Sequence, residues 1–261
     1  MGILNVTPDS FSDGGRYLDA GAAIEHGLEL AAQGAAIIDV GGESTRPGAA
    51  GVELREELRR VIPVVEGLLG AGIDATISVD TSKLEVARAA LDAGATFVND
   101  VTAFRAAPEM ASLVAACGAE CCVMHMQGEP RTMQKEPRYA DVVGDVREFL
   151  RERVAFALDA GVARERIVVD PGFGFGKTVE HNLELLDRLD ELAVLGQPIL
   201  IGTSRKSFLG ALTGRDERDR LAATIATNVI GLLRGASVFR VHDVAAVRDA
   251  LALAAATVSG R

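Results

Sequence analysis

The sequence has no tryptophan, few other aromatic residues and only three cysteines in its 261 positions. Aromatic residues make up 4% of the chain and hydrophobic residues 48%, so small aliphatic side chains must fill the interior. Cys117, Cys121 and Cys122 are an odd set without the spacing of a metal or redox motif. Cys121 and Cys122 lie inside an apolar run, where we expect reduced, buried thiols, and this favours a cytoplasmic location.

The chain is also short of positive charge and of long apolar runs. Its formal net charge is −10, which makes nucleic acid and anionic membrane surfaces poor partners. No apolar run approaches the roughly 20 residues of a membrane span. The N-terminus lacks the basic segment of a signal peptide, so none is expected. Any phosphate group that binds must therefore meet a local basic cluster.

Eight short apolar runs are present instead, and they are predicted strands. They are continuous rather than alternating, which indicates burial on both faces and hence a parallel sheet. The runs are Ile3–Val6, Ala36–Val40, Thr76–Val79, Ala95–Val98, Ala119–Met124, Arg166–Val169, Pro198–Ile201 and Ser237–Val241.

Amphipathic segments separate these runs and are predicted helices. Several end on Gly-Ala directly before the next run, at Gly34, Gly94, Gly118 and Gly235. A glycine there is typical of a left-handed helix C-cap. The segments are Ala20–Ala32, Glu53–Leu69, Lys83–Leu91, Pro108–Ala116, Asp141–Ala160, His181–Leu192, Arg218–Leu233 and Val244–Thr257.

Polar or glycine-rich residues follow all eight runs on their C-terminal side. A closed barrel brings all strand ends to one mouth, whereas a doubly wound open sheet uses mainly those at its switch point. The sequence therefore predicts an α/β fold, a (β/α)8 TIM barrel, with the active site at the C-terminal mouth of the strands. A single domain spans 1–261, because no linker or composition shift divides the chain. The open sheet is the alternative.

The glycine-rich segment 170–177, DPGFGFGK, fits neither common nucleotide motif. A Walker A loop needs glycine where Pro171 stands, and a dinucleotide fingerprint needs it at Lys177. The segment could be a simple turn. However, Asp170 ends a buried run, where an unpaired carboxylate is costly unless a ligand donates to it. We interpret Asp170 as a ligand-binding residue.

Two other strand ends carry acids or amides that face the same choice. Asp80 could cap the following helix, but Thr81 or Ser82 can do so as well, which leaves Asp80 for a site. Asn99 and Asp100 follow the next run, and we predict that Asn99 points inward.

Basic residues follow the last two strands. Arg205 and Lys206 could be a solvated pair, but at a barrel mouth in an acidic chain they suggest ligand contact, with one inward and one outward. Arg240 and His242 are two apart and so share a face of a strand. Together they could clamp a phosphate. His125 stays ambiguous, and His26 and His181 are expected on helix surfaces.

Two long connections follow the first two strands, at 5–15 and 39–49. Loops of this length in a compact barrel are often active-site lids. Phe11 and Arg46 are side chains that a plain surface loop does not need.

Seven segments closely resemble dihydropteroate synthases, in order along nearly the whole chain. The first two are highly specific to that family. The segments are MGILNVTPDSFSDGG, DVGGESTRPGA, ISVDTS, VMHMQG, DPGFGFGK, SRKS and RVHD.

The resemblance implies a transferase of folate biosynthesis, from a family that is a sulfonamide target. It would condense 6-hydroxymethyl-7,8-dihydropterin diphosphate with 4-aminobenzoate, giving 7,8-dihydropteroate and pyrophosphate. The pterin would meet Asp80, Asn99, Asp170, Lys206, Arg240 and Met124. The diphosphate would meet Asn5, Thr45, Arg46, Arg240 and His242, with Mg²⁺ on Asn5. The 4-aminobenzoate would meet Thr45, Pro47, Phe173 and Ser207. Catalytic roles would fall to Asp80, Lys206, Asp13 and Phe11.

The resemblance also implies a homodimer, for which the apolar segment Leu221–Leu233 is a plausible contact, though it could equally pack on the barrel. Three alternatives stay open. One is a pterin-dependent methyltransferase domain, which has no diphosphate to hold. Another is a non-catalytic pterin-binding paralogue. The third is an unrelated phosphate-binding barrel, which would not explain Asp80, Asn99 and Asp170 together.

Overall fold

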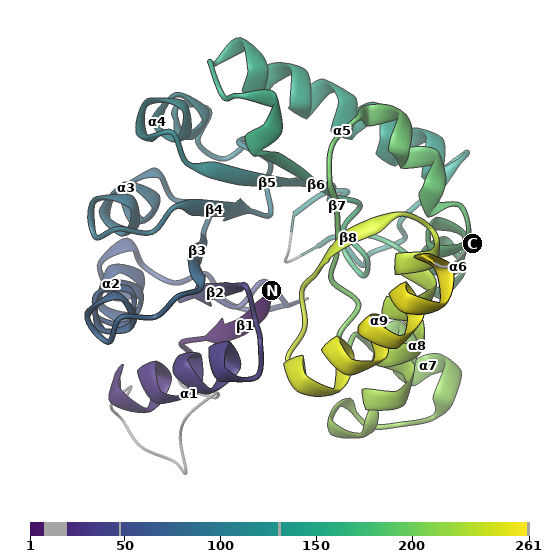
Figure 1. Ribbon diagram of the computed structural model, residues 1–261. Helices are drawn as coiled ribbons and strands as arrows, with labels where there is room; N and C mark the ends of the chain where they lie inside the picture. Colours follow the sequence, from purple (N-terminus) through teal and green to yellow (C-terminus); the bar gives the residue numbers. More distant parts are fainter. Residues whose placement is uncertain (8–19, 47, 130–131, 260–261) are drawn as a thin grey trace.

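A computed structural model describes residues 1–7, 20–46, 48–129 and 132–259. Its eight strands form one parallel sheet in the order β1 to β8 (Figure 1). The strands are β1 (Gly2–Asn5), β2 (Ile37–Gly41), β3 (Thr76–Asp80), β4 (Phe97–Asp100), β5 (Glu120–Met124), β6 (Ile167–Asp170), β7 (Ile199–Ile201) and β8 (Ala236–Phe239).

The sheet closes on itself between its first strand and the end of β8. Gly2 bridges Val241 in parallel. The Ile3 N–H donates to the Val241 carbonyl at 3.0 Å, and the Val241 N–H donates to the Met1 carbonyl at 3.0 Å. Closure excludes the open sheet and confirms the predicted (β/α)8 barrel.

Helices surround the barrel, and most lie where the sequence predicts them. They are α1 (Ala20–Ala32), α2 (Leu54–Gly70), α3 (Leu84–Asp92), α4 (Glu109–Cys117), α5 (Val142–Asp159), α6 (Val179–Asp187), α7 (Ser207–Thr213), α8 (Leu221–Leu233) and α9 (Val244–Ser259). Short 3₁₀ turns are η1 (Arg164–Arg166), η2 (Leu189–Leu195) and η3 (Glu217–Asp219).

The structure differs from the predicted helices in one division and one addition. The segment predicted as one helix over His181–Leu192 is α6 followed by the 3₁₀ turn η2. Helix α7 was not predicted, because its seven residues end at Gly214 in a left-handed conformation and give too short a pattern. The predicted glycine caps are confirmed: Gly118 ends α4 with φ of 62°, and Gly34, Gly94 and Gly235 also have positive φ.

Alternate strand residues serve two apolar layers. One layer lies inside the barrel and consists of Phe97, Cys122, Val168 and Leu200. The other lies between strands and helices and includes Cys121. Cys121 and Cys122 are buried free thiols, as predicted, and Cys117 is exposed. Burial raises the pKa of Cys121 to about 12, so this thiol stays protonated.

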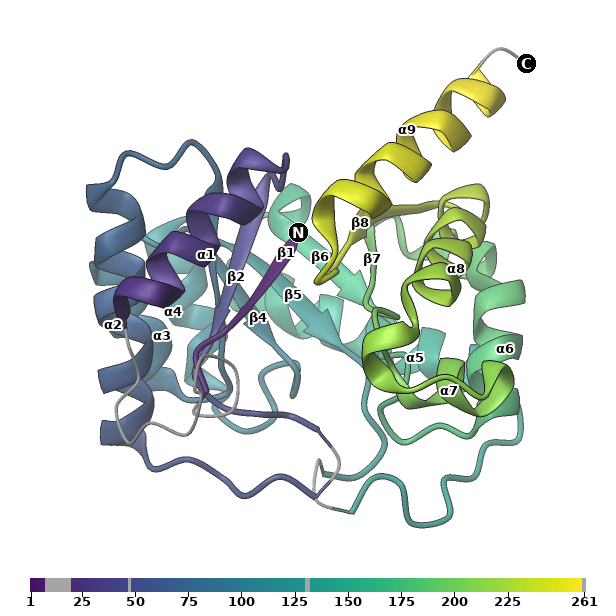
Figure 2. The same ribbon diagram turned by 90° about the horizontal axis from the view of Figure 1, so that it is seen from below.

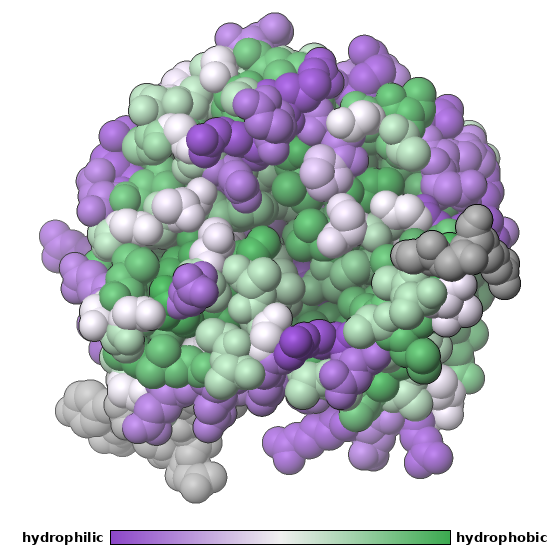
Figure 3. Space-filling view, viewed as in Figure 1, coloured by the Kyte–Doolittle hydropathy of each residue, from purple (hydrophilic) through white to green (hydrophobic). Residues whose placement is uncertain are grey.

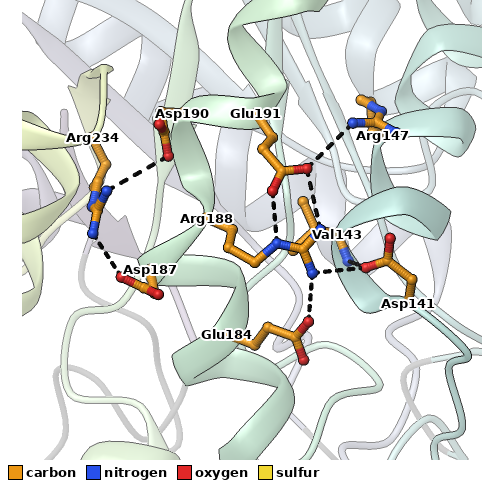
Figure 4. Close-up of polar contacts among 9 residues, drawn as sticks. All are labelled: Asp141, Val143, Arg147, Glu184, Asp187, Arg188, Asp190, Glu191 and Arg234. Carbon is orange, nitrogen blue, oxygen red and sulfur yellow. Dashed lines mark hydrogen bonds and ion pairs between the residues drawn. The ribbon is translucent and has the colours of Figure 1, made fainter.

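Ion pairs on the outer surface join α5, α6 and η2. Arg188 bonds Glu184, Glu191 and Asp141, the residue that caps α5 by accepting from the Val143 N–H (Figure 4). Arg234, at the end of α8, pairs with Asp187 at 2.6 Å. These groups are solvent-exposed in large part, so each pair adds little stability.

The carboxyl ends of the strands lie on one side of the molecule. In Figure 2, β1 runs from the N-terminus toward the lower edge, where the connections that follow the strands gather. Among the helices in the described part of the chain, none is both long enough and apolar enough to cross a membrane.

Candidate active site

A cavity of about 780 Å³ opens at the C-terminal ends of the strands. The last residue of β3 and residues from the connections after β1, β2, β5, β6, β7 and β8 line it, as a barrel mouth requires. Its predicted members are Asn5, Thr45, Arg46, Asp80, Lys206, Ser207, Arg240 and His242.

A buried ion cluster forms the floor of this cavity. The Arg240 Nε donates to Asp39 at 2.6 Å, and its Nη2 donates to Asp80 at 2.6 Å. Asp39 is completely buried and also accepts from Ser78 Oγ at 2.6 Å and from Asn99 Nδ2 at 3.0 Å. One guanidinium thus serves two carboxylates from neighbouring strands.

Asp39 is a site residue that the sequence reasoning missed. The signal was present, because Asp39 interrupts an apolar run near its end, much as Asp80 and Asp170 end theirs. Its bond to Asn99 uses the amide nitrogen, which leaves the Asn99 oxygen to accept from a ligand. Asp100, in contrast, accepts the N–H groups of Thr102 and Phe104 in its own loop. Asn99 therefore belongs to the buried cluster that forms the cavity floor, and Asp100 does not.

Crowding of acids on the floor changes how they ionise. Burial raises the pKa of Asp80 to about 7; Arg240 opposes this rise, and Asp39 adds to it. Burial lowers the pKa of Arg240, but its bonds and attraction to Asp39 and Asp80 outweigh this and raise it, so the guanidinium stays charged. The floor therefore holds a fixed cation and a carboxylate that can titrate near neutral pH.

This raised pKa predicts a pH-dependent gain in stability for Asp80→Asn. The folded-state pKa of Asp80 is about 7, against an ordinary 3.8, so its contribution to stability is present below about pH 4 and lost as pH rises through about 7. Asparagine stays neutral throughout. We expect the variant's free energy of unfolding, relative to wild type, to rise by about 2.5–3 kcal/mol between about pH 5 and pH 8.5.

Urea unfolding at both pH values measures this difference. Asp159→Asn, an exposed position on α5, is the matched control and should differ from wild type equally at both. If the Asp80→Asn variant differed from wild type in free energy of unfolding by the same amount at both pH values, the raised pKa of Asp80 would be contradicted.

Asp170 and Lys206 form a second charged group beside the floor. Asp170 Oδ1 accepts the Gly172 N–H at 2.7 Å, and in the described residues no donor is paired with Oδ2. Burial raises the pKa of Asp170, against the opposing charge of Lys206. Lys206 donates to the Phe173 carbonyl, and its ammonium lies 4.5 Å from the centre of the Phe175 ring. Burial lowers the pKa of Lys206 to about 8, and Asp170 opposes this.

The loop after β6 is shaped by glycines and by a buried lysine. A Cβ on Gly172, which has φ of 69°, would lie 1.9 Å from the His125 carbonyl oxygen, so only glycine fits. Lys177 Nζ bonds the carbonyls of Gly172 and Phe175 and lies 2.9 Å from His125 Nδ1. Burial, followed by the charge of Lys177, lowers the pKa of His125 to about 2, so this ring is neutral. The ambiguous His125 therefore supports the loop.

This loop places its two phenylalanines differently from the prediction. Phe173, predicted to contact 4-aminobenzoate, is completely buried and stacks on Phe208, away from the cavity lining. Phe175 lines the cavity instead. Met124 lies beside Asp170 in the strand register and belongs to a buried apolar cluster against which Phe175 packs.

Cations surround the rim of the cavity. Arg46, on the loop after β2, pairs with Glu217 at 2.6 Å. Arg205 pairs with Asp243 at 2.6 Å, and Lys206 donates to the Phe173 carbonyl. Both residues line the cavity, so the predicted division into one inward and one outward side chain is wrong. Glu217 is a further rim residue that the sequence did not indicate.

His242 is held on the rim by Ser204. Its Nδ1 lies 3.0 Å from Ser204 Oγ. Burial, then the charges of Arg205 and Arg240, lowers the pKa of His242 to about 3. A neutral ring that accepts from Ser204 at Nδ1 carries its proton on Nε2, which can then donate to an anion. His181, expected on a helix surface, is half-buried and forms a capping box with Thr178.

The remaining predicted residues fall into two groups. Asn5 and Thr45 are half-buried and Ser207 is exposed, and all three line the cavity. Phe11, Asp13 and Pro47 lie outside the described residues. No group of three or more His, Cys, Asp or Glu side chains that could hold a metal is found in the described ranges.

Comparison with known proteins agrees with this geometry. A family model described as "Pterin binding enzyme" matches residues 1–242. The dihydropteroate synthase of Escherichia coli K12 is 48% identical over 263 residues, which covers 100% of this chain and 92% of that protein. The chain belongs to the dihydropteroate synthase family. Members of this family are transferases of folate biosynthesis.

Solved structures of the family have the same fold. A Xanthomonas albilineans dihydropteroate synthase with 4-aminobenzoic acid is 49% identical, with a TM-score of 0.92 over 99% of this chain and 92% of that chain. The Xanthomonas albilineans enzyme in complex with 7,8-dihydropteroate is 46% identical, with a TM-score of 0.88 over 99% and 92%.

Proposed function

We propose that the cavity joins 6-hydroxymethyl-7,8-dihydropterin diphosphate to 4-aminobenzoate, as in the rest of the dihydropteroate synthase family, with the roles given below. One observation carries these roles: carboxylates and an amide lie at or just beneath the buried base of the cavity, among Arg240 and Lys206, and further donors, Arg46 and His242, lie on its rim. The substrate has the same polarity, because its ring presents N–H donors and its other end is anionic.

The deep end would bind the pterin. Asp170 Oδ2 and the Asn99 oxygen are acceptors for the aminopyrimidine N–H groups, and burial strengthens such bonds. Lys206 can donate to the ring's carbonyl and nitrogen from beside Asp170. Arg240 would stack on the ring and Met124 would pack beneath it.

The rim would bind the diphosphate. Arg240 reaches from the floor, His242 donates from Nε2, and Asn5, Thr45 and Arg46 also line the cavity. Arg46 is bound to Glu217 in this structure, so a diphosphate must compete with that carboxylate. Thr45, Pro47 and Ser207 would contact the 4-aminobenzoate, and we now add Phe175 in the place expected for Phe173.

Mg²⁺ would be held by Asn5 together with substrate oxygens. The donors fit such an ion, because a single amide oxygen is too little for a resident metal but suits one that arrives on a phosphate. When bound, the ion would offset charge on the departing pyrophosphate.

The chain's own residues would assist the bond change at the exocyclic methylene. The C–O bond to the diphosphate breaks, the arylamine nitrogen forms the new C–N bond and then loses a proton. Arylamines are weak nucleophiles, so we propose that C–O cleavage runs ahead of attack. Asp80 would then stabilise positive charge on the pterin more than it stabilises the substrate. Asp13 and Phe11 keep their predicted roles, as a second carboxylate and a barrier to water.

Pyrophosphate release that depends on added 4-aminobenzoate tests the proposal. A non-catalytic paralogue would bind the pterin diphosphate and release nothing. A methyltransferase domain would bind bare pterin and its diphosphate alike. Either result would refute the assignment.

His242→Ala should weaken binding of the diphosphate end of the substrate and leave binding of the pterin end unchanged. Loss of one donor to an anion is worth roughly 1.5–3 kcal/mol, so we expect the Kd of the pterin diphosphate to rise about tenfold or more. The Kd of the bare pterin should stay within about twofold. Calorimetry with both ligands measures this, with His26→Ala on α1 as the control. Equal weakening of both ligands would remove His242 from the diphosphate site.

Assembly and location stay predictions. We propose a homodimer through α8 and α9, where Figure 3 shows apolar residues among the side chains. Leu221, Ile230, Leu233 and Leu253 are exposed there. A cytoplasmic location, which the buried cysteines favour, and sulfonamide inhibition, which the family resemblance favours, are predictions of the same kind.

A further inference from the structure

A series of ion pairs ties the loop after β2 to the barrel, and its members are not among the residues assigned to substrate. Lys83, in the connection after β3, donates from Nζ to both Glu43 and Glu57. Glu43 begins the loop, and Glu57 lies on α2. The other oxygen of Glu57 accepts from Thr81 Oγ1 at 2.6 Å. Three separate elements therefore meet at one ammonium group.

The inner end of this series of ion pairs is buried, at Glu57. Glu57 is completely buried, with Lys83 as its cation and Thr81 as its second donor. Burial lowers the pKa of Lys83, but its hydrogen bonds to Glu43 and Glu57 outweigh this and raise it above its ordinary value. Lys83 is thus charged wherever the protein is folded near neutral pH, and it offers a fixed anchor.

Glu43 uses that anchor to close the base of the loop. Its Oε1 accepts the Val52 N–H at 3.1 Å, while Oε2 accepts from Lys83. One carboxylate thus joins the first residue of the segment 43–52 to its last. Directly before it, the Gly42 carbonyl accepts from Arg60 at 2.9 Å, and Glu56 holds Arg60 at 2.8 Å.

The residues between these ties are the ones assigned to substrate. Ser44, Thr45 and Arg46 follow Glu43 directly and line the cavity. Glu43 also borders the cavity, but both its oxygens already have donors. Lys83 is outside the lining. Neither residue needs to touch a ligand to affect how the loop meets one.

We propose that Glu43 and Lys83 are positioning residues that hold Thr45 and Arg46 at the barrel mouth. The inference rests on the proposed roles of those two residues. Without the tether, only a fraction of molecules presents the loop in its binding arrangement, and apparent affinity falls by that fraction. Saturating substrate restores the arrangement, so KM is affected much more than kcat.

Glu43→Ala is the test, because it removes both loop ties and leaves the Glu57–Lys83–Thr81 group intact. We expect the KM for 4-aminobenzoate to rise about tenfold and kcat to change less than about threefold. The Kd of bare pterin, bound on the floor, should be unchanged. Without substrate, amide hydrogen exchange should speed up in the peptide that contains Val52 and not elsewhere.

Three further variants make the result specific. Glu43→Gln keeps the acceptor for Val52 and should lie between wild type and Glu43→Ala. Lys83→Arg keeps the cation and should retain the wild-type KM. Glu66→Ala, an exposed acid on α2, should match wild type in every measurement.

The outcomes separate this inference from the proposed function. A wild-type protein that releases no pyrophosphate would refute the function, but accelerated exchange at Val52 in Glu43→Ala would still support the tether. An active wild type whose Glu43→Ala variant has the same KM and the same exchange would overturn the tether alone. A variant that loses kcat and thermal stability together would assign Glu43 to the fold, and would overturn it as well.

Discussion

Arg240→Met should lower the free energy of unfolding by about 3–5 kcal/mol near pH 8, because it leaves two buried carboxylates without their cation. Asp39 is completely buried, Asp80 nearly so, and both bond the same guanidinium. Breaking one side of a buried ion pair costs more than the pair itself contributes, since the remaining charge keeps its desolvation penalty.

The loss should shrink as pH falls. Asp80 already has a raised pKa of about 7 with Arg240 in place, and removing the cation raises it further. Near pH 5 the Asp80 carboxyl group is then neutral, and the part of the penalty that comes from Asp80 is gone. Urea unfolding of wild type and variant at the two pH values measures both effects.

Two variants serve as controls for this experiment. Arg234→Met makes the same replacement at an exposed pair with Asp187, where we expect a loss below about 1 kcal/mol. Adding Asp39→Asn to Arg240→Met removes one of the stranded charges and should recover part of the stability. A loss from Arg240→Met that is equal at both pH values, or unaffected by Asp39→Asn, would mean that packing and not charge explains it.

The barrel could be predicted from sequence because its signals are local. Each strand is a continuous apolar run, which only a sheet covered on both faces requires. The polar residues after each run then identify the end of the strand that faces the site. The prediction that the sheet closes into a barrel depended on finding polar residues after all eight strands. The bridge from Gly2 to Val241 confirms that closure.

The phenylalanines of the β6 loop could not be assigned from sequence. Phe173 and Phe175 are two residues apart with glycine on both sides, so no strand or helix period applies. Positive φ angles at Gly172, Gly174 and Gly176 decide which ring turns inward. The backbones of His125 and Gln127, far away in sequence, leave no room for a side chain at Gly172 and Gly176.

Spacing was a partial guide to the basic residues. Arg240 and His242 do share the cavity, but β8 ends at Phe239, so strand alternation is not the reason. Arg240 reaches down to Asp39, while His242 is held sideways by Ser204. The partners of Arg46 and Arg240, namely Glu217, Asp39 and Asp80, lie 160 or more residues away along the chain. No local pattern records such pairs.

Asp170→Asn should abolish tight pterin binding while leaving the fold intact. The Asn side chain can still accept the Gly172 N–H that Asp170 Oδ1 accepts at 2.7 Å, so the loop keeps its support. What is lost is the negative charge facing the ring. Each charge-assisted bond is worth roughly 1.5–3 kcal/mol, and with two N–H groups on the aminopyrimidine edge we expect the Kd of bare pterin to rise about 100-fold or more.

An analogue makes this test specific to the contact. A pterin that lacks the 2-amino group has one donor fewer, so the wild type should bind it more weakly, and Asp170→Asn should weaken it much less than it weakens pterin itself. The difference between the two effects measures the coupling of the carboxylate to that amino group. Unchanged thermal stability would show that the variant is folded. If Asp170→Asn weakened both ligands by the same factor, the 2-amino group would not contact Asp170, and the pterin would have to lie in another orientation on the floor formed by Asp39, Asp80 and Arg240.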